Sequence, residues 1–225
     1  MSGPFGSQQW MYSAGFYPHE IGNSVRFDSN SQLTRTPSSA GNRRTYTWSA
    51  WFKRSKLSDA AYDGLFSAGV GGSNSTDRDV MYFDNADHLH FNGYTSSGYT
   101  FQYKTTQQFR DPSAWYHIVL VQDTTQSTAS DRTKIYINGE LITSYSTSTA
   151  ASQNHEGFVN NTNLHAIGST PYNTTYFDGY IAEVNFIDGT ALTPASFGET
   201  KSDTWIPKKY TGSYGTNGYY LDFAT

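Results

Sequence analysis

Cysteine is absent from this 225-residue chain. Disulfide bonds and cysteine-ligated metal sites are therefore excluded, whereas the redox compartment stays open. No stretch approaches the roughly 18 consecutive apolar residues of a membrane span, so we expect no membrane partner. The first residues, MSGPFGSQQWMYSAGFYP, lack a basic start followed by an apolar run. We therefore expect synthesis in a cytoplasm without a secretory signal.

Charged residues are also scarce, at 15% of the chain, and the formal net charge is -4. Proteins that bind nucleic acid through its phosphates need clustered Lys and Arg side chains. Only the pairs Arg43-Arg44 and Lys208-Lys209 approach a cluster, and such pairs are typical of a solvated surface. The charge pattern therefore argues against a nucleic-acid partner.

Aromatic residues are abundant, with 18 Tyr, 14 Phe and 5 Trp. Aromatic residues and Thr favour strands, and runs of helix-forming residues do not occur. In Thr45–Arg54 the residues alternate, so Trp48, Ala50 and Phe52 face one way and Thr47, Ser49 and Trp51 the other. The dipeptide Asn138-Gly139 predicts a type I′ hairpin that joins Thr133–Ile137 to a returning strand, Leu141–Tyr145.

Strand candidates of this kind recur along the chain between turn residues, which predicts an all-β, antiparallel two-sheet sandwich. The remaining candidates are 24–28, 32–36, 64–70, 79–84, 88–93, 99–105, 115–122, 163–168, 179–187 and 218–223. A short helix is expected after Thr193-Pro194. We divide the chain into an aromatic N-terminal arm (1–22), the sandwich domain (23–198) and a C-terminal arm (199–225).

An ordered set of motifs carries a family resemblance. The motifs are SVRFD (24–28), TWSAWFKR (47–54), WYHIVL (115–120), KIYINGEL (134–141), IGS (167–169) and FDGYIAEVNFIDGTALTP (177–194). In this order they resemble the concanavalin A-like lectin/glucanase superfamily, closest to its laminin-G and pentraxin branch. The resemblance covers residues 24–198 and implies a concanavalin A-like jelly roll.

The two ends carry a narrower resemblance. The stretches GPFGSQQWMYSAGFYPHEI and WIPKKYTGSYGTNGYYLDF are similar to lectin-like virion and tail-fibre proteins of tailed bacteriophages. This implies a virion structural protein on a tail fibre or the capsid exterior, with other virion proteins as partners. A composition rich in Tyr and Trp and poor in Lys and Glu also favours protein contacts, so we expect a homo-oligomer.

The stretch YFDGYIAEVNFIDGTALTP places Glu183, Asn185 and Asp188 close to the Glu-x-Asp-x-x-Glu pattern of some glucanases. A retaining glycosidase needs two carboxyl groups about 5 Å apart, and the amide of Asn185 cannot share a proton. We therefore predict no catalysis and keep a polysaccharide-degrading glucanase, or a free carbohydrate-binding lectin, as the alternative. We expect the strand to turn one apolar set toward the opposite sheet: Tyr180, Ala182, Val184 and Phe186.

Calcium is the metal that the resemblance suggests, because pentraxin and laminin-G relatives often bind it through loop oxygens. The loops SNSTDRD (73–79) and QNHEG (153–157) offer such oxygens on Asn74, Asp77, Asp79, Asn154 and Glu156. Neither loop has a determined ligand spacing, so no metal and no cofactor are assigned. Among the histidines, His88 and His90 share a strand face, and His117 is expected to be a satisfied core residue.

Two tyrosine-rich stretches have the chemistry of a sugar site, which combines aromatic faces with amide and hydroxyl groups. The stretch STPYNTTYFDG (169–179) contributes Tyr172, Asn173 and Tyr176, and GYTSSGYT (93–100) contributes Tyr94 and Tyr99. We predict these five as the ligand-binding residues, with host cell-surface glycans as the ligand.

Overall fold

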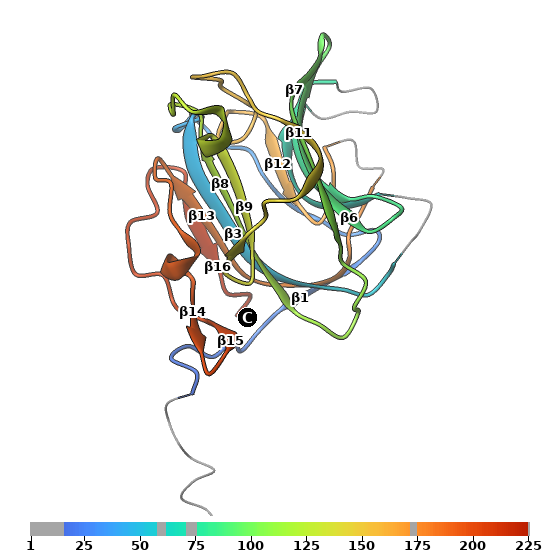
Figure 1. Ribbon diagram of the computed structural model, residues 1–225, viewed down its shortest axis with the longest axis vertical. Helices are drawn as coiled ribbons and strands as arrows, with labels where there is room; N and C mark the ends of the chain where they lie inside the picture. The colour runs from blue at the N-terminus through green and yellow to red at the C-terminus, as the bar shows by residue number, and fades with distance from the viewer. Residues whose placement is uncertain (1–15, 58–61, 71–75, 172–174, 225) are drawn as a thin grey trace, which may run out of the picture.

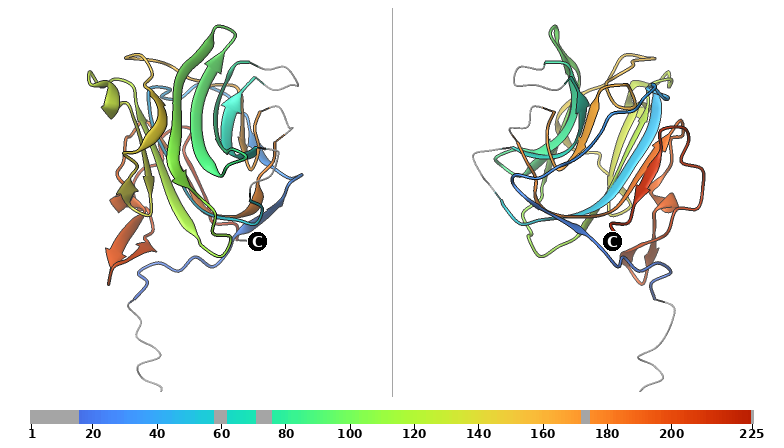
Figure 2. Two further views of the ribbon diagram at one scale, coloured as in Figure 1. Left: turned by 45° about the vertical axis from the view of Figure 1, so that its right-hand side comes forward. Right: turned by 180° about the vertical axis from the view of Figure 1, so that it is seen from behind.

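Two antiparallel sheets of seven strands each face one another and enclose the core (Figure 1 and Figure 2). The computed structural model describes residues 16–57, 62–70, 76–171 and 175–224. The strand pairings among these residues are antiparallel, so the predicted all-β jelly-roll sandwich is confirmed. None of the helical turns in these ranges is long and apolar enough to cross a membrane.

Sheet A has the order β1-β13-β3-β8-β9-β10, and β16 also pairs with β13. Its strands are β1 (Val25–Asp28), β3 (Thr45–Arg54), β8 (Tyr116–Asp123), β9 (Thr133–Ile137), β10 (Glu140–Leu141), β13 (Asp178–Asp188) and β16 (Tyr219–Leu221). On β3 the predicted alternation holds. Trp48, Ala50 and Phe52 pack in the core between the sheets, while Ser49 and Trp51 lie on the outer face.

Sheet B has the order β11-β7-β6-β5-β4-β12-β2. Its strands are β2 (Leu33–Arg35), β4 (Asp63–Gly69), β5 (Arg78–Phe83), β6 (His88–Thr95), β7 (Gly98–Gln108), β11 (Tyr145–Thr149) and β12 (Leu164–Ile167). A separate hairpin pairs β14 (Gly198–Lys201) with β15 (Thr204–Pro207). The 3-10 turns are η1 (Ala129–Asp131) and η2 (Pro194–Ser196), and η2 lies where a short helix was expected.

The Asn138-Gly139 turn has positive φ at both residues, 49° and 85°, as the predicted type I′ hairpin requires. The predicted returning strand Leu141–Tyr145 is wrong, because the chain stays in sheet A only through Leu141. It then crosses between the layers, where Ile142 packs against the core, and joins sheet B as β11 at Tyr145. Ile142 still donates its backbone N–H to the Ile135 carbonyl oxygen at 2.9 Å, so the chain leaves sheet A directly after this residue.

Glu183 forms a β-bulge that reverses the alternation of β13. Its φ is 50°, and the register with β3 shifts between Ala182 and Asn185. Before the bulge Ile181 enters the core; after it Val184 and Phe186 do so. The expectation that Tyr180 and Ala182 share the inner face is therefore wrong, because the extra residue turns them to the outer face. Tyr180 is 37% exposed.

The first strand, β1, and the last strand, β16, pair with the same edge of β13. Val25–Asp28 of β1 pairs with the first part of β13, and Tyr219–Leu221 of β16 pairs with Val184–Phe186. The C-terminal end and the segment that leads into β1 accordingly lie together in Figure 1. Both terminal segments thus approach the bulge at Glu183.

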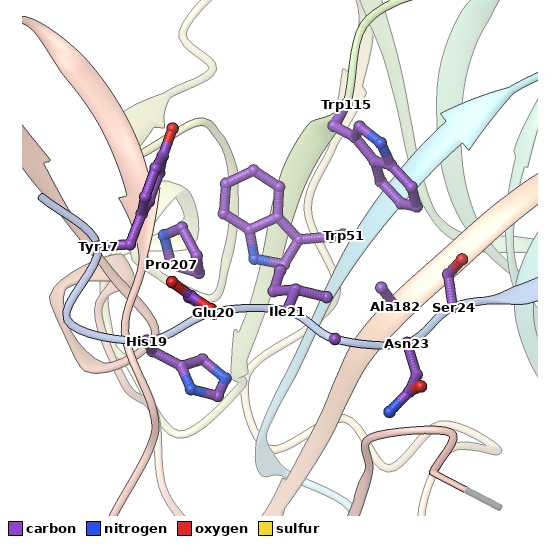
Figure 3. Close-up of a pocket in the computed structure, with 11 residues that line it drawn as sticks. Tyr17, His19, Glu20, Ile21, Asn23, Ser24, Trp51, Trp115, Ala182 and Pro207 are labelled. Atoms are coloured by element: carbon purple, nitrogen blue, oxygen red, sulfur yellow. The ribbon is translucent and has the colours of Figure 1, made fainter. Parts of the chain in front are cut away.

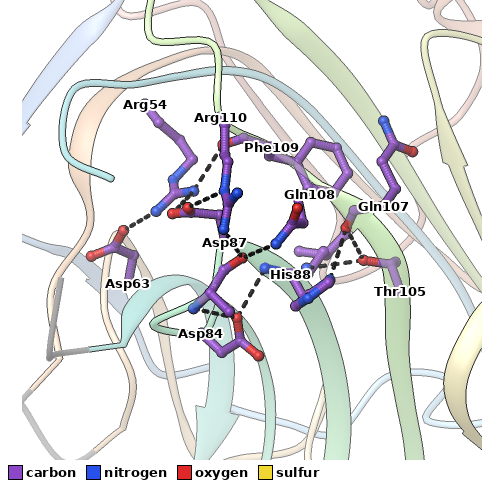
Figure 4. Close-up of polar contacts among 12 residues, drawn as sticks. Arg54, Asp63, Asp84, Asp87, His88, Thr105, Gln107, Gln108, Phe109 and Arg110 are labelled. Carbon is purple, nitrogen blue, oxygen red and sulfur yellow. Dashed lines mark hydrogen bonds and ion pairs between the residues drawn. The ribbon is translucent and has the colours of Figure 1, made fainter. Parts of the chain in front are cut away.

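Arg54 joins the two sheets at one end of the sandwich (Figure 4). Its side chain is 1% exposed and donates to Asp63 Oδ2 at 2.7 Å, Asp87 Oδ1 at 2.9 Å and the carbonyl oxygen of Phe109 at 2.9 Å. Its guanidinium also lies 4.5 Å from the ring centre of Phe83. Because β3 supplies Arg54 and β4 supplies Asp63, the ion pair links sheet A to sheet B.

Candidate functional site

The outer face of sheet B carries three rows of side chains. The residues that alternate with them along β5 and β6 point into the core: Met81, Phe83, Leu89 and Phe91. In the order β5, β6, β7, the rows are Arg78-Tyr94-Tyr99, Val80-Asn92-Gln102 and Tyr82-His90-Lys104. At about 3.3 Å per residue, the first and third rows lie about 13 Å apart. We call this surface, together with Tyr62 beside Tyr82, the tyrosine face.

Tyr94 and Tyr99 form one end of the tyrosine face. Their ring centres are 4.9 Å apart at an interplanar angle of 80°, and the Arg78 guanidinium lies 4.7 Å from the ring centre of Tyr94. A register shift on β7 beside Tyr94 inserts Thr100, which keeps Tyr99 on the same face. Tyr99 is 54% exposed, so the structure brings two predicted residues together with a ring open to solvent.

The other end of the tyrosine face is a directional hydrogen-bond chain. His90 Nε2 lies 3.0 Å from Asp84 Oδ2, which also accepts from Lys104 Nζ at 2.7 Å. A neutral His90 that donates through Nε2 accepts at Nδ1, so the Tyr82 hydroxyl, 3.2 Å away, donates to it. Burial lowers the pKa of His90 despite Asp84, which keeps the ring neutral at pH 7.

Ionisation at this end is set by the same contacts. Burial opposes ionisation of Asp84, but hydrogen bonds from Lys104, His90 and backbone N–H groups lower its pKa overall. Burial raises the pKa of Tyr82. The tyrosine face therefore presents a neutral imidazole, a neutral phenol and a carboxylate already paired with Lys104. None of these groups is poised to exchange a proton near pH 7.

Asn92 lies between the two aromatic ends. Its Nδ2 donates to the Tyr82 hydroxyl oxygen at 3.2 Å. Its Oδ1 is buried and has no hydrogen-bond partner among the described residues. Buried acceptors are normally satisfied, and an unsatisfied one costs about 1–3 kcal/mol. The amide oxygen of Asn92 is therefore an unused acceptor below the middle of the tyrosine face, where Asn92 is only 3% exposed.

The second predicted stretch is only partly seen. Tyr172 and Asn173 lie outside the described residues. Tyr176 pairs with Ser169, whose backbone lies against Gly64, and Gly64 faces Tyr82 from β4. Through Ser169 and Gly64, Tyr176 is therefore connected to the part of sheet B beside Tyr82, whereas Tyr99 lies on β7, three strands from β4.

Sequence reasoning missed Arg78, Tyr82 and Asn92. A signal was present, since Tyr82 and Arg78 are four residues apart on β5, and Asn92 and Tyr94 are two apart on β6. Such spacings put residues on one face of a strand. Which face of each strand points outward became evident only from the packing of the sandwich.

The Glu183, Asn185 and Asp188 constellation is occupied by other parts of the chain. Glu183 accepts from Tyr220 at 2.8 and 2.9 Å and lies 2.9 Å from His19 Nε2. Asn185 Oδ1 accepts from the Tyr214 hydroxyl at 3.0 Å. Asp188 accepts three further hydrogen bonds, from the backbone N–H groups of Asn42 and Asn217 and from Asn160 Nδ2. The three side chains fasten both terminal segments to sheet A.

The whole chain can be compared with known proteins at this point. A family model described as the concanavalin A-like lectin/glucanases superfamily matches residues 27–196. The chain belongs to this superfamily. Its jelly roll is thus a lectin-like, carbohydrate-binding fold. No curated protein matches the sequence.

Solved structures agree with this superfamily at the level of the fold. A heptameric SAP-like pentraxin from Limulus polyphemus is 14% identical, with a TM-score of 0.53 over 90% of this chain and 96% of that one. The LG4-5 domains of the mouse laminin alpha1 chain are 12% identical, with a TM-score of 0.50 over 92% of this chain and 48% of that one.

Ser49 and His117 are hydrogen-bonded on sheet A, but the tautomer of His117 is the wrong one for activating the serine as a nucleophile. Trp205 Nε1 donates to His117 Nδ1 at 3.0 Å, so His117 Nε2 carries the hydrogen and donates to Ser49 Oγ at 2.9 Å. A general base needs a free nitrogen lone pair toward the serine. Burial lowers the pKa of His117 to about 3. His117 is thus the satisfied, buried residue that the sequence predicted.

Asp79 and Glu156, two of the residues predicted to offer calcium oxygens, bind other parts of the chain, although Asp79 Oδ1 is buried without a hydrogen-bond partner among the described residues. Asp79 Oδ2 accepts from the backbone N–H groups of Phe158 and Val159 at 2.6 and 3.0 Å. Glu156 forms ion pairs with Arg43 and Arg44 at 3.3 and 2.8 Å. Asn74 lies outside the described residues, among which three-residue groups of metal-ligating side chains do not occur. A role for calcium therefore stays a question for experiment.

Proposed function

We propose that this chain is a non-catalytic glycan-binding protein and that the tyrosine face binds the glycan. The proposal rests on one observation. Two aromatic groups, Tyr94 with Tyr99 and Tyr82 with His90, lie about 13 Å apart on one sheet face, and the buried, unsatisfied Asn92 oxygen lies between them. Pyranose rings present apolar C–H faces to aromatic rings and hydroxyl groups to amides. The ring of Tyr99, which is 54% exposed, supplies the aromatic contact at one end.

The tyrosine face can be tested on a glycan array. Tyr99→Ala and Tyr94→Ala each remove an aromatic ring from one end of the tyrosine face. We expect each substitution to lower the affinity for the bound glycan about tenfold, or by about 1.4 kcal/mol. Leu141→Ala is the control, because Leu141 is 42% exposed on β10 of the other sheet. Unchanged affinity in both tyrosine variants would rule out this face as the glycan site.

Hydrolysis of a polysaccharide is the alternative that this geometry disfavours. The hydrogen bonds of Glu183 to Tyr220 and His19 place the two terminal segments where a substrate would have to reach the carboxylate. Asn185 supplies an amide in place of a second carboxyl group. Release of reducing sugar by the wild-type chain that disappears in Glu183→Gln would overturn the non-catalytic part of the proposal.

The finer proposal is that the chain is a structural subunit of a bacteriophage particle, on a tail fibre or the capsid exterior. The resemblance of its two ends to lectin-like phage proteins supports this location. Docked terminal segments suit a subunit that assembles with copies of itself and with other virion proteins. The pentraxin with a similar fold is heptameric, which makes a homo-oligomer a reasonable expectation.

Particle location and oligomeric state are open to direct measurement. We expect mass spectrometry of gradient-purified particles to detect the chain in a stoichiometric amount, and antibody labelling to place it on the outside. Light scattering after size exclusion should give a multiple of the 25.1 kDa chain mass. Absence from purified particles would refute the virion role and leave the glycan-binding role standing.

A further inference from the structure

A groove lies on the outer face of sheet A, whereas the tyrosine face lies on sheet B; Figure 3 draws the residues that line the groove. It has a volume of about 540 Å³ and runs between the outer face of sheet A and the segment 17–24 that leads into β1. Trp51, Trp115 and Ala182 line its sheet side, and Tyr17 and Pro207 lie at its other end. We call it the tryptophan groove.

The depth of the groove follows from the order of side chains across sheet A. Ala182 of β13 faces Trp51 of β3, which in turn faces His117 of β8. The rings of Trp51 and His117 stack with centres 4.8 Å apart, and Trp205, which donates to His117 Nδ1, has its ring centre 5.9 Å from that of His117. The second face of the Trp51 ring therefore points toward the small Ala182 side chain, which leaves space above β13.

The C-terminal segment covers only part of this sheet face. Val119, Val121 and Ile187 pack under Phe197, Tyr210 and Tyr214. Among the described residues, this apolar cluster does not extend to the end of the sheet that holds Trp51 and Trp115, which are 8% and 38% exposed. A tryptophan that keeps more than a third of its surface exposed beside a cavity suits a binding site better than packing alone.

The chemistry of the lining selects the ligand. Among the described residues that line the groove there is no Lys or Arg, and its one histidine, His19, is paired with Glu183 at 2.9 Å. Glu20, Asn23 and Ser24 offer carboxylate, amide and hydroxyl groups that bond to hydroxyl hydrogens. Aromatic faces with acceptors and without cations suit a neutral sugar and disfavour a phosphate, sulfate or acidic sugar.

We propose that the tryptophan groove is a second carbohydrate site, which binds a neutral oligosaccharide with a pyranose ring stacked on Trp115. One wall of the site is built by the segment before β1 and by Pro207, which lie outside the residues matched by the superfamily model. It is independent of the tyrosine face. With one site on each sheet, a single chain would bind two glycans at once, which raises avidity on a glycan-coated surface.

The test is an array of neutral and sialylated oligosaccharides, probed with the full chain and followed by calorimetry on the neutral compounds that bind. The Trp115 substitutions are made in the double variant Tyr94→Ala/Tyr99→Ala, which lacks both aromatic rings at one end of the tyrosine face. We expect this variant to keep binding a neutral oligosaccharide. Adding Trp115→Ala should lower that affinity about tenfold or more, whereas Trp115→Phe should retain most of it. Tryptophan emission should shift on binding and lose that shift in Trp115→Ala.

The outcomes separate the two sites. Loss of all neutral binding in the Tyr94→Ala/Tyr99→Ala variant would overturn the tryptophan groove while supporting the tyrosine face. Equal affinity of the Trp115→Ala and Trp115→Phe variants would also overturn it. If Trp115→Ala changes the mass of the oligomer in light scattering and leaves sugar binding unchanged, the groove is a contact between copies of the chain instead.

Discussion

At the scale of single residues, the buried Arg54 side chain has the largest expected effect on stability. Removing one partner of a buried ion pair leaves charge without compensation and costs about 3–5 kcal/mol. We expect Arg54→Met to lower the free energy of unfolding by about that amount, because it takes hydrogen-bond donors from Asp63, Asp87 and the Phe109 carbonyl. Urea unfolding followed by fluorescence measures the change.

Arg110 provides a matched control for Arg54. It also binds Asp87, with Nε 3.0 Å from Oδ2, but its side chain is 53% exposed. Exposed ion pairs contribute about 0–1 kcal/mol, so Arg110→Met should change stability little. Similar losses in the two variants would contradict the view that burial, and not the charge pair itself, decides the contribution.

At the scale of elements, the bulge at Glu183 connects strand geometry to the docking of the chain ends. The bulge lies between the part of β13 that pairs with β1 and the part that pairs with β16. Glu183 there accepts from Tyr220, a residue of β16. The bulge therefore serves as the attachment point of the C-terminal strand.

Tyr220→Phe should loosen β16 without unfolding the sandwich. The variant removes the hydroxyl that donates to Glu183, a hydrogen bond to a charged group worth about 1.5–3 kcal/mol. We expect faster amide hydrogen exchange across 219–221, with little change in the core strands β3 and β8. Tyr210→Phe is the control, since its hydroxyl donates to the Ser213 carbonyl three residues away. Unchanged exchange in β16 would mean that backbone pairing alone holds the strand.

At the scale of the whole molecule, three buried groups contribute to the pH dependence of stability with opposite signs. Burial lowers the pKa of His117 to about 3 and of His165 to about 4, from 6.5. The unfolded chain therefore takes up these protons first, and stability is lost as pH falls below 6.5. Burial raises the pKa of Asp79 from 3.8 to about 6, so its contribution is present at low pH and is lost as pH rises through 6.

The two effects oppose each other, which makes Asp79→Asn a sharp test. Near pH 5 the unfolded chain holds two histidine protons and the folded chain one aspartate proton. For these three groups the excess is about one proton, which contributes a loss of about 1.4 kcal/mol per pH unit on acidification. His90 and His155, whose pKa values burial also lowers, add to the loss. Asp79→Asn removes the opposing proton and should steepen the total loss by about 1.4 kcal/mol per pH unit. Urea unfolding between pH 4 and 7 measures it, and an equal or shallower slope would contradict the sign assigned to Asp79.

Much of the strand pattern was readable from local chemistry. The alternation in Thr45–Arg54 and the Asn138-Gly139 turn predicted β3 and the β9-β10 hairpin with their observed geometry. The predictions failed where one extra residue or one layer change intervened, as at Glu183 and after Leu141. At the candidate sites, Tyr94 and Tyr99 were predictable because they flank one hairpin, whereas Trp51 and Trp115 were not recognised as lining a groove.

The sequence by itself determined the sandwich, because strand alternation and turn type depend on a few neighbouring residues. Only the tertiary structure decided which faces are left open. The tyrosine face needs rows from β5, β6 and β7 in register, and the tryptophan groove needs a terminal segment laid across sheet A. Both depend on contacts between residues far apart in the chain, for which the local pattern carries no information.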